Sequence, residues 1–231
     1  MDKIELKAPA SWGEMTVDQL KLVVKLMRLQ LTREELLLTL FLNFTGVKKS
    51  ENYFITIDGA MFGMEDYEIM DFCNRISFIL DEMPCDIANP TTVDGHLNNI
   101  SFGNYFHADA LMYGYRKKND KEMVRNALYD LGMGKESIDE DYAELVSLWW
   151  TGVQQWLKIQ YPTVFDCDGE SGEAYDPLKA RQNIMLMLNN NCPQDNQRIE
   201  DSKMHDVLSA LQAKIEHARQ LEEEMKRHGK K

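Results

Sequence analysis

Cysteine is scarce in this chain of 231 residues, and the four that occur are widely spaced: Cys73, Cys85, Cys167 and Cys192. None forms a CxxC pair, so the common local signatures of a zinc site or a thiol redox centre are missing. A chain of this length can build a hydrophobic core without a disulfide framework. The cysteine usage therefore favours a reducing, intracellular setting, and we expect the protein to work in the cytoplasm.

Long apolar runs are also missing. The longest, such as LLLTLFL at 36–42, are far shorter than the roughly 20 residues that a membrane helix needs. The opening stretch MDKIELKAPASWGEM contains no apolar core of a signal peptide. We therefore expect no membrane segment and no membrane partner.

Basic residues are in deficit, with 26 Lys and Arg against 38 Asp and Glu, for a net charge of -12. No basic surplus remains to displace counterions from a phosphate backbone, so a nucleic-acid partner is not expected. Trp149, Trp150 and Trp156 follow an acidic stretch. We interpret them as core residues rather than as a platform for stacking bases. The negative charge itself is interpreted as a source of solubility.

Local catalytic motifs are missing as well, including HExxH, GxSxG and the phosphate loop GxxxxGK[ST]. No histidine lies four residues from another. His107 and Asp109 are two potential ligands close together, but one such pair does not make a metal site. We therefore expect no cofactor, no metal and no enzymatic activity. An enzyme whose catalytic residues are dispersed along the chain stays open as an alternative.

One acidic segment has the alternation of a calcium loop, with Asp166, Asp168 and Glu170 at every second position. An EF-hand loop beginning at Asp166 needs glycine at its sixth place and glutamate at its twelfth. Ser171 and Pro177 stand there instead. We interpret the segment as a solvated linker.

Helical periodicity dominates the rest of the chain. Thr16 has Gln19 at the capping-box spacing, and Thr32 is a second candidate cap, with Glu34 and Glu35 favourably placed near a helix N-terminus. The second of these helices, over 33–44, should end at Gly46. Further helical patterns cover the following ranges: 65–83, from about 104, 120–131 and 139–160. The segment 84–103 is rich in turn-forming residues and is predicted to be irregular.

Residues 52–64 break this rhythm. Tyr53, Ile55 and Ile57 alternate with their neighbours, and Asp58-Gly59 offers a two-residue turn. The predicted fold class is therefore mainly α: a multi-helix body with one small β-hairpin (about 52–64) and a C-terminal helical arm. Because a lone hairpin is marginally stable, we expect it to pack on the helices.

The acidic segment also supplies the predicted domain boundary. A body over 1–164 would be followed by a linker at 165–176 and an arm over 177–231, with helices at 177–189 and 196–227. The second of these helices carries a narrow apolar stripe, which we predict to bind protein: Met204, Leu208, Leu211, Ile215 and Ala218. Leu221, one place early, and Met225 extend it. Such a helix must lay its stripe on a partner, on a second copy or on its own body.

Several blocks of the sequence resemble a group of uncharacterised proteins encoded in phages and prophages of gut Bacteroidetes. The blocks are SWGEMTVDQLKLVVKL, LTREELLLTLFLNFTGVK, ISFGNYFHADALMYGYRKKNDKEMVRNALYDLG, WWTGVQQWLKIQYPTVF and the tail from Asp176 to Arg227. Members of the group look like tail-assembly chaperones encoded beside tape-measure genes. The resemblance implies a non-enzymatic role in tail assembly, in the cytoplasm of the host cell, with the tape-measure protein as the partner. A structural protein of the tail, neck or connector is the main alternative.

Overall fold

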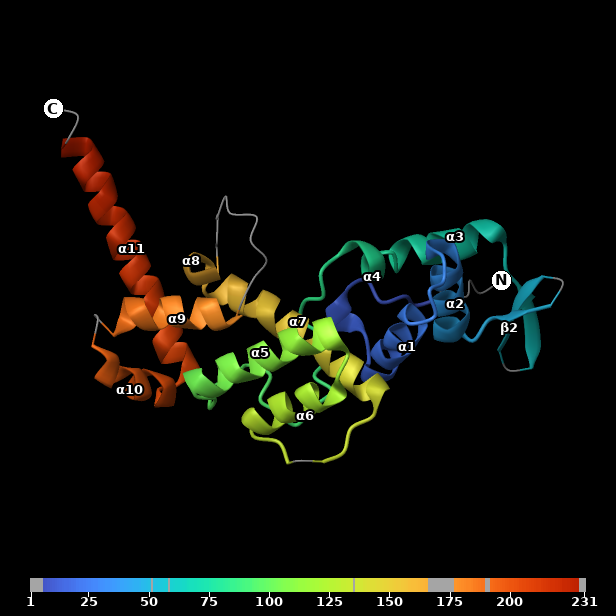
Figure 1. The fold of residues 1–231 in the computed structure, drawn as a ribbon. Coiled ribbons are helices and arrows are strands. Elements are labelled where there is room, and N and C mark those ends of the chain that lie inside the picture. The colour runs from blue at the N-terminus through green and yellow to red at the C-terminus, as the bar shows by residue number, and fades with distance from the viewer. Residues whose placement is uncertain are drawn as a thin grey trace. The chain divides into compact units, whose positions relative to one another are not determined.

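The computed structural model describes residues 6–50, 52–57, 59–134, 136–165, 177–189 and 192–228. These residues form two compact units, Met1–Pro90 and Thr91–Lys231, each of which is considered by itself (Figure 1). Helices dominate both units, and the strands form one small sheet, so the predicted mainly α fold class is confirmed.

The first unit begins with a short 3-10 turn and a pair of helices, η1 (Trp12–Glu14), α1 (Val17–Met27) and α2 (Arg33–Thr45). Both α-helices start with a complete capping box, where the sequence predicts the box at Thr16 and a cap at Thr32. The Thr16 and Thr32 hydroxyls each accept a hydrogen bond from the backbone N–H three residues on. The side chains of Gln19 and Glu35 accept in turn from the backbone N–H of Thr16 and Thr32. Gly46 ends α2 with a φ of 71°, a left-handed conformation that glycine adopts without strain.

The remaining helices of this unit divide the predicted segment 65–83 into α3 (Asp66–Arg75) and α4 (Phe78–Asp81). The unit has its own apolar core, in which the rings of Phe41 and Phe72 meet edge to face with centroids 5.2 Å apart. Leu20, Val23, Leu40 and Ile76 are fully buried in the same unit. This packing supplies the burial that short helices need to be stable.

The predicted hairpin is confirmed as β2 (Tyr53–Ile57) paired antiparallel with β3 (Ala60–Gly63). A two-residue strand that the sequence does not reveal, β1 (Lys48–Lys49), pairs with the other side of β2. The packing of the hairpin differs from the expectation. Every residue of β3 is exposed. Among the described residues, the strands contact one another much more than they contact any helix.

The regular elements among the described residues of the second unit are helices, apart from one isolated β-bridge, and residues 91–100 are irregular, as predicted. Its elements are α5 (Phe102–Lys118), α6 (Lys121–Asp130), α7 (Glu140–Gln160), α8 (Pro162–Phe165), α9 (Pro177–Leu188), η2 (Pro193–Asp195), α10 (Asn196–Asp201) and α11 (Met204–His228). Pro162 follows the end of α7, as predicted, because proline cannot donate the bond that would continue that helix.

One core runs through this unit, built mainly from α5, α6 and α7. Trp149 and Trp150 lie inside it, with 2% and 0% of their surfaces exposed, so their interpretation as core residues is confirmed. Met185 of α9 and Met204 of α11 are buried in the same core.

The division of the chain therefore differs from the predicted one. It falls after Pro90, and the helices of the predicted arm belong to the same unit as α5 to α7. Burial of apolar residues from the arm in a shared core is the physical reason. Residues 166–176, which include Asp166, Asp168 and Glu170 of the predicted linker, lie outside the described residues.

Candidate protein-binding surface

The long helix α11 begins at a pair of backbone hydrogen bonds to the start of α5, which we call the backbone clip. The sequence predicts one helix over 196–227, but the structure breaks it at Ser202 and Lys203. The Phe102 amide donates to the carbonyl of Ser202 (2.9 Å), and the Met204 amide donates to the carbonyl of Ile100 (3.0 Å). This short bridge separates α10 from α11. The predicted single helix was wrong here because these carbonyl and amide groups bond across the chain.

The first half of the predicted stripe is buried in the protein's own core. Met204, Leu208 and Leu211 are exposed by 0%, 0% and 1%. Met204 and Leu208 belong to the core cluster of the second unit. The hypothesis that these three residues bind a partner is therefore corrected. Their side chains are covered by the same chain. Of the three arrangements open from the sequence, the structure therefore shows docking on the protein's own body for these residues.

Polar contacts hold this first half in place. The Nε2 atom of His205 donates to the carbonyl of His96 at 2.7 Å. A carbonyl can only accept, so in the neutral ring Nδ1 accepts from the Tyr161 hydroxyl, also at 2.7 Å. One turn before the stripe becomes exposed, Lys214 Nζ donates to the Met187 carbonyl at 2.6 Å. That carbonyl lies in the last turn of α9, where the helix dipole favours a cation.

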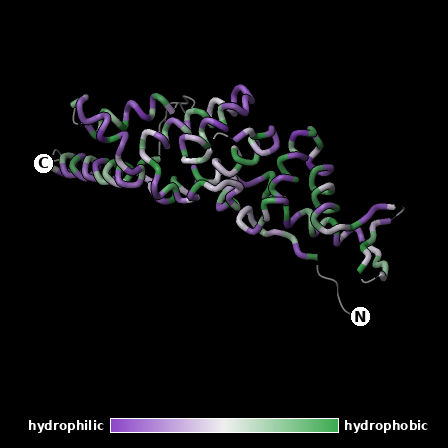
Figure 2. Tube along the Cα trace, turned by 90° about the horizontal axis from the view of Figure 1, so that it is seen from below, coloured by the Kyte–Doolittle hydropathy of each residue, from purple (hydrophilic) through white to green (hydrophobic). Residues whose placement is uncertain are grey.

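The second half of the stripe is open to solvent. Ile215 is half-buried, and every described side chain from Glu216 to Arg227 is exposed. Leu221 and Met225 expose 45% and 66% of their surfaces. Figure 1 shows this half of α11 extending beyond α9, and Figure 2 shows hydrophobic and hydrophilic residues alternating along it. Ala218, Leu221 and Met225 therefore form the accessible part of the stripe, which we call the distal stripe.

Apolar side chains are also exposed at the end of α9, and charged residues border the distal stripe. Leu186 and Met187, in the last turns of α9, expose 61% and 53% of their surfaces. At 100° per residue, Glu222 of α11 lies next to Ala218 on one side of the distal stripe, and Lys226 and Arg219 lie beyond it. The opposite face carries mainly charged and polar residues, including an ion pair of Glu223 with Arg227 at 3.8 Å. Such a surface suits an apolar helix face better than a charged ligand.

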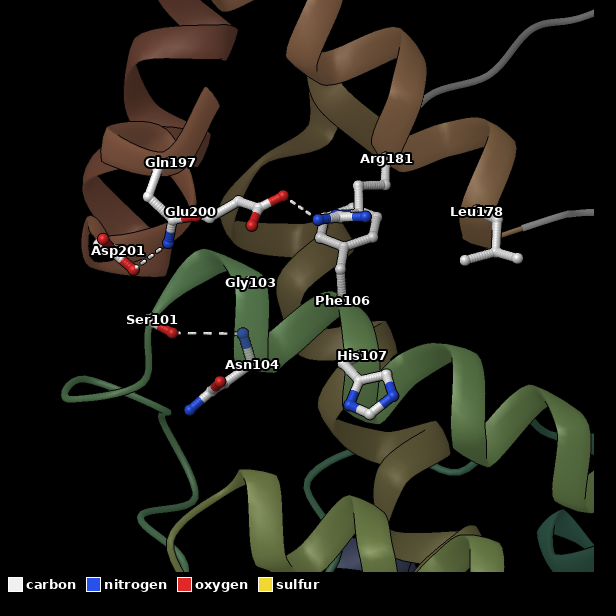
Figure 3. A pocket seen from close by; sticks show the side chains of 10 residues that line it. All are labelled: Ser101, Gly103, Asn104, Phe106, His107, Leu178, Arg181, Gln197, Glu200 and Asp201. Carbon is white, nitrogen blue, oxygen red and sulfur yellow. Dashed lines mark hydrogen bonds and ion pairs between the residues drawn. The ribbon is translucent and has the colours of Figure 1, made fainter. Parts of the chain in front are cut away.

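A polar cavity of about 330 Å³ lies elsewhere in the second unit, among α5, α9 and α10 (Figure 3). Arg181 reaches from α9 to pair with Glu200 of α10. The backbone N–H of Asn104 donates to Ser101 Oγ at 3.2 Å, so Ser101 caps α5. Gln197 Nε2 donates to Asp201 Oδ1 at 3.0 Å. These bonds link the polar lining residues to one another within the protein.

His107 stands at the rim of this cavity, with Nδ1 2.7 Å from Oδ2 of Asp130. A histidine oriented by a carboxylate is half of a nucleophile-activating arrangement. Among the described lining residues the one hydroxyl belongs to Ser101, and it accepts the capping bond of α5. Ser101 thus serves as the helix cap of α5 in this arrangement.

Asp109, two residues further on, is buried in the core, where its carboxylate accepts hydrogen bonds from α7. It is 1% exposed and accepts from Trp150 Nε1 at 2.9 Å and from Gln154 Nε2 at 2.5 Å. Residues two apart on a helix face nearly opposite directions, which explains why His107 and Asp109 do not converge. A search of the described residues finds no group of three or more His, Cys, Asp or Glu side chains that could hold a metal ion.

Comparison of the chain with protein-family models, with curated proteins and with solved structures finds no match. Within the described part of the chain, no helix is both long enough and apolar enough to cross a membrane. The distal stripe was found from its periodicity, although the sequence could not separate it from the buried half. The exposed Leu186 near the end of α9 was missed, because it lies in an apolar run that is equally typical of core.

Proposed function

We propose that this protein is a non-enzymatic assembly adaptor that binds a helical segment of another protein through the distal stripe of α11. The observation that carries the proposal is the contrast within one helix. Met204, Leu208 and Leu211 are covered by the chain itself, whereas Leu221 and Met225 continue the stripe into solvent. A helix of which one half is anchored and the other half exposed presents its apolar residues at little further entropic cost.

The setting that we propose is phage tail assembly, with the tape-measure protein as the partner. This setting rests on the sequence resemblance. Tape-measure proteins are long helical chains with apolar stripes, which must be covered before assembly. An acidic protein with a projecting amphipathic helix can cover such a stripe by helix packing, while its charge keeps the complex soluble.

Co-expression with the tape-measure protein encoded beside it tests this proposal. The wild-type chain should co-purify with that partner, and Leu221→Asp and Met225→Asp should each abolish recovery of the complex. Gln220→Asp is the matched control, since it adds the same charge on the opposite face of the same exposed turn. Leu211 is unsuited to the experiment because its substitution would disrupt the core.

Co-purification that survives both substitutions would show that the distal stripe is not the binding surface. Mass spectrometry of purified virions separates the adaptor from its main alternative. A chaperone should be missing from mature particles, whereas a structural component of the tail, neck or connector should be present in them.

A further inference from the structure

The sheet of the first unit has an apolar face that is partly exposed to solvent. Its register places Tyr53, Ile55 and Ile57 of β2 on the same face as Ala60 and Phe62 of β3. Phe62 and Ile57 expose 39% and 36% of their surfaces. A small sheet gains independent stability when such a face is packed. Added strands also stabilise a small sheet, so pairing at an edge would stabilise this one.

The two edges of this sheet differ in protection. The β1 edge consists of Lys48 and Lys49, and lysine on an edge strand is a common device against unwanted pairing. The β3 edge reads Ala-Met-Phe-Gly over 60–63, without a charge or a proline. In a chain of which 28% of residues are charged, this edge is the unprotected one.

The backbone of β3 is ready to pair. The backbone N–H of Met64 donates to the Tyr53 carbonyl at 2.9 Å, so these two residues form a hydrogen-bonded pair of the antiparallel ladder. By the alternation of that ladder, Ala60 and Phe62 direct their backbone groups towards β2. Met61 and Gly63 direct theirs towards the open edge. The Met61 side chain is 67% exposed, on the face opposite to Phe62.

We propose that β3 pairs antiparallel with the β3 strand of a second copy of this chain, around a two-fold axis at Met61. Symmetric pairing places the residue on the axis opposite its own counterpart, so a charged residue there would face a like charge. This strand carries none. The same register places Phe62 beside Ala60 of the second copy, a large side chain next to a small one. The two apolar faces then join into one face of a six-stranded sheet.

Light scattering of the full-length chain over a range of concentrations measures this association. We expect a dimer whose dissociation constant rises at least about tenfold in Met61→Lys, because two ammonium groups would meet at the axis. Met70→Lys is the matched control, since Met70 lies on α3 and is 65% exposed. It introduces the same charge away from the edge and should leave the dimer intact.

Mixing two charge variants tests the symmetry of the contact. Met61→Lys and Met61→Glu should each be monomeric alone and should form a heterodimer together, since opposite charges then meet at the axis. A wild-type chain that stays monomeric, a dimer that persists in Met61→Lys, or a mixture that forms no heterodimer overturns the proposal. A strand of another protein at this edge would produce the first of these results. The distal stripe of α11 is unaltered in every variant, so adaptor binding can be scored separately.

Discussion

Gly103 of α5 lies against Glu200 of α10 so closely that a Cβ atom on Gly103 would stand 3.3 Å from the Cβ of Glu200 and 3.4 Å from its carbonyl oxygen. The contact lies beside the clip that joins Phe102 to Ser202 and so fixes where α11 begins. The absence of a side chain at Gly103 thus lets α10 approach α5 closely.

Enlarging this glycine should destabilise the second unit. We expect Gly103→Leu to lower the free energy of unfolding by about 1–3 kcal/mol, as overpacking of a close contact does. Gly134→Leu is the control, because the nearest atom to a Cβ there is the Glu136 side chain at 4.0 Å. Urea unfolding of both variants checks the prediction. Equal stabilities would show that α10 moves away from α5 without cost.

The buried carboxylate of Asp109 should be costly to remove. We expect Asp109→Ala to destabilise the protein by about 2–4 kcal/mol, because the indole N–H of Trp150 loses its acceptor inside the core. Trp150→Phe removes that donor. In a double-mutant cycle measured by urea unfolding, the double variant should therefore cost less than the sum of the single variants. Strict additivity would mean that the bond contributes nothing.

The two halves of α11 should contribute unequally to stability. A chain that ends at Glu216 should unfold within about 0.5 kcal/mol of the full-length chain, because the described residues that it loses are exposed. Leu211→Ala, which shortens a side chain that is 1% exposed, should cost about 2–5 kcal/mol. Thermal and urea unfolding compare the two. A large loss on truncation would show that the distal stripe is covered by the chain itself.

The pair of Arg33 and Asp81 should produce a measurable pH dependence. Two bonds of 2.8 and 2.6 Å join the guanidinium to the carboxylate, and they lower the pKa of Asp81 from its ordinary value. A depressed carboxyl pKa stabilises the fold above the ordinary value near 4, and this stabilisation is lost as the pH falls through the depressed pKa.

An NMR titration of the Asp81 carboxyl group measures this pKa directly. Arg33→Gln should raise it towards the ordinary value. Arg75→Gln, whose partner is Asp71 at 3.3 Å, should leave the Asp81 titration unchanged. An identical Asp81 midpoint in the wild type and in Arg33→Gln would contradict the assignment of the shift to this ion pair.

Local signals in the sequence were sufficient for much of the secondary structure. The capping boxes at Thr16 and Thr32, the glycine stop at Gly46 and the alternation of β2 all act within a few residues of the chain. Their outcome is decided by bonds between near neighbours, so composition and spacing predict it. The strand β1 was not predicted, because two lysines have no strand pattern of their own. They form a strand only through pairing with β2.

The fate of the C-terminal stripe shows what lies beyond such signals. Periodicity alone established that Met204, Leu208, Leu211, Ile215 and Ala218 share one side of a helix. Only tertiary structure decided that the first three are buried and that the apolar side chains after Ile215 stay exposed. The deciding bonds join Ser202 and Met204 to residues about a hundred positions earlier. A helical repeat records which residues face the same way, whereas what covers them depends on the packing of distant segments.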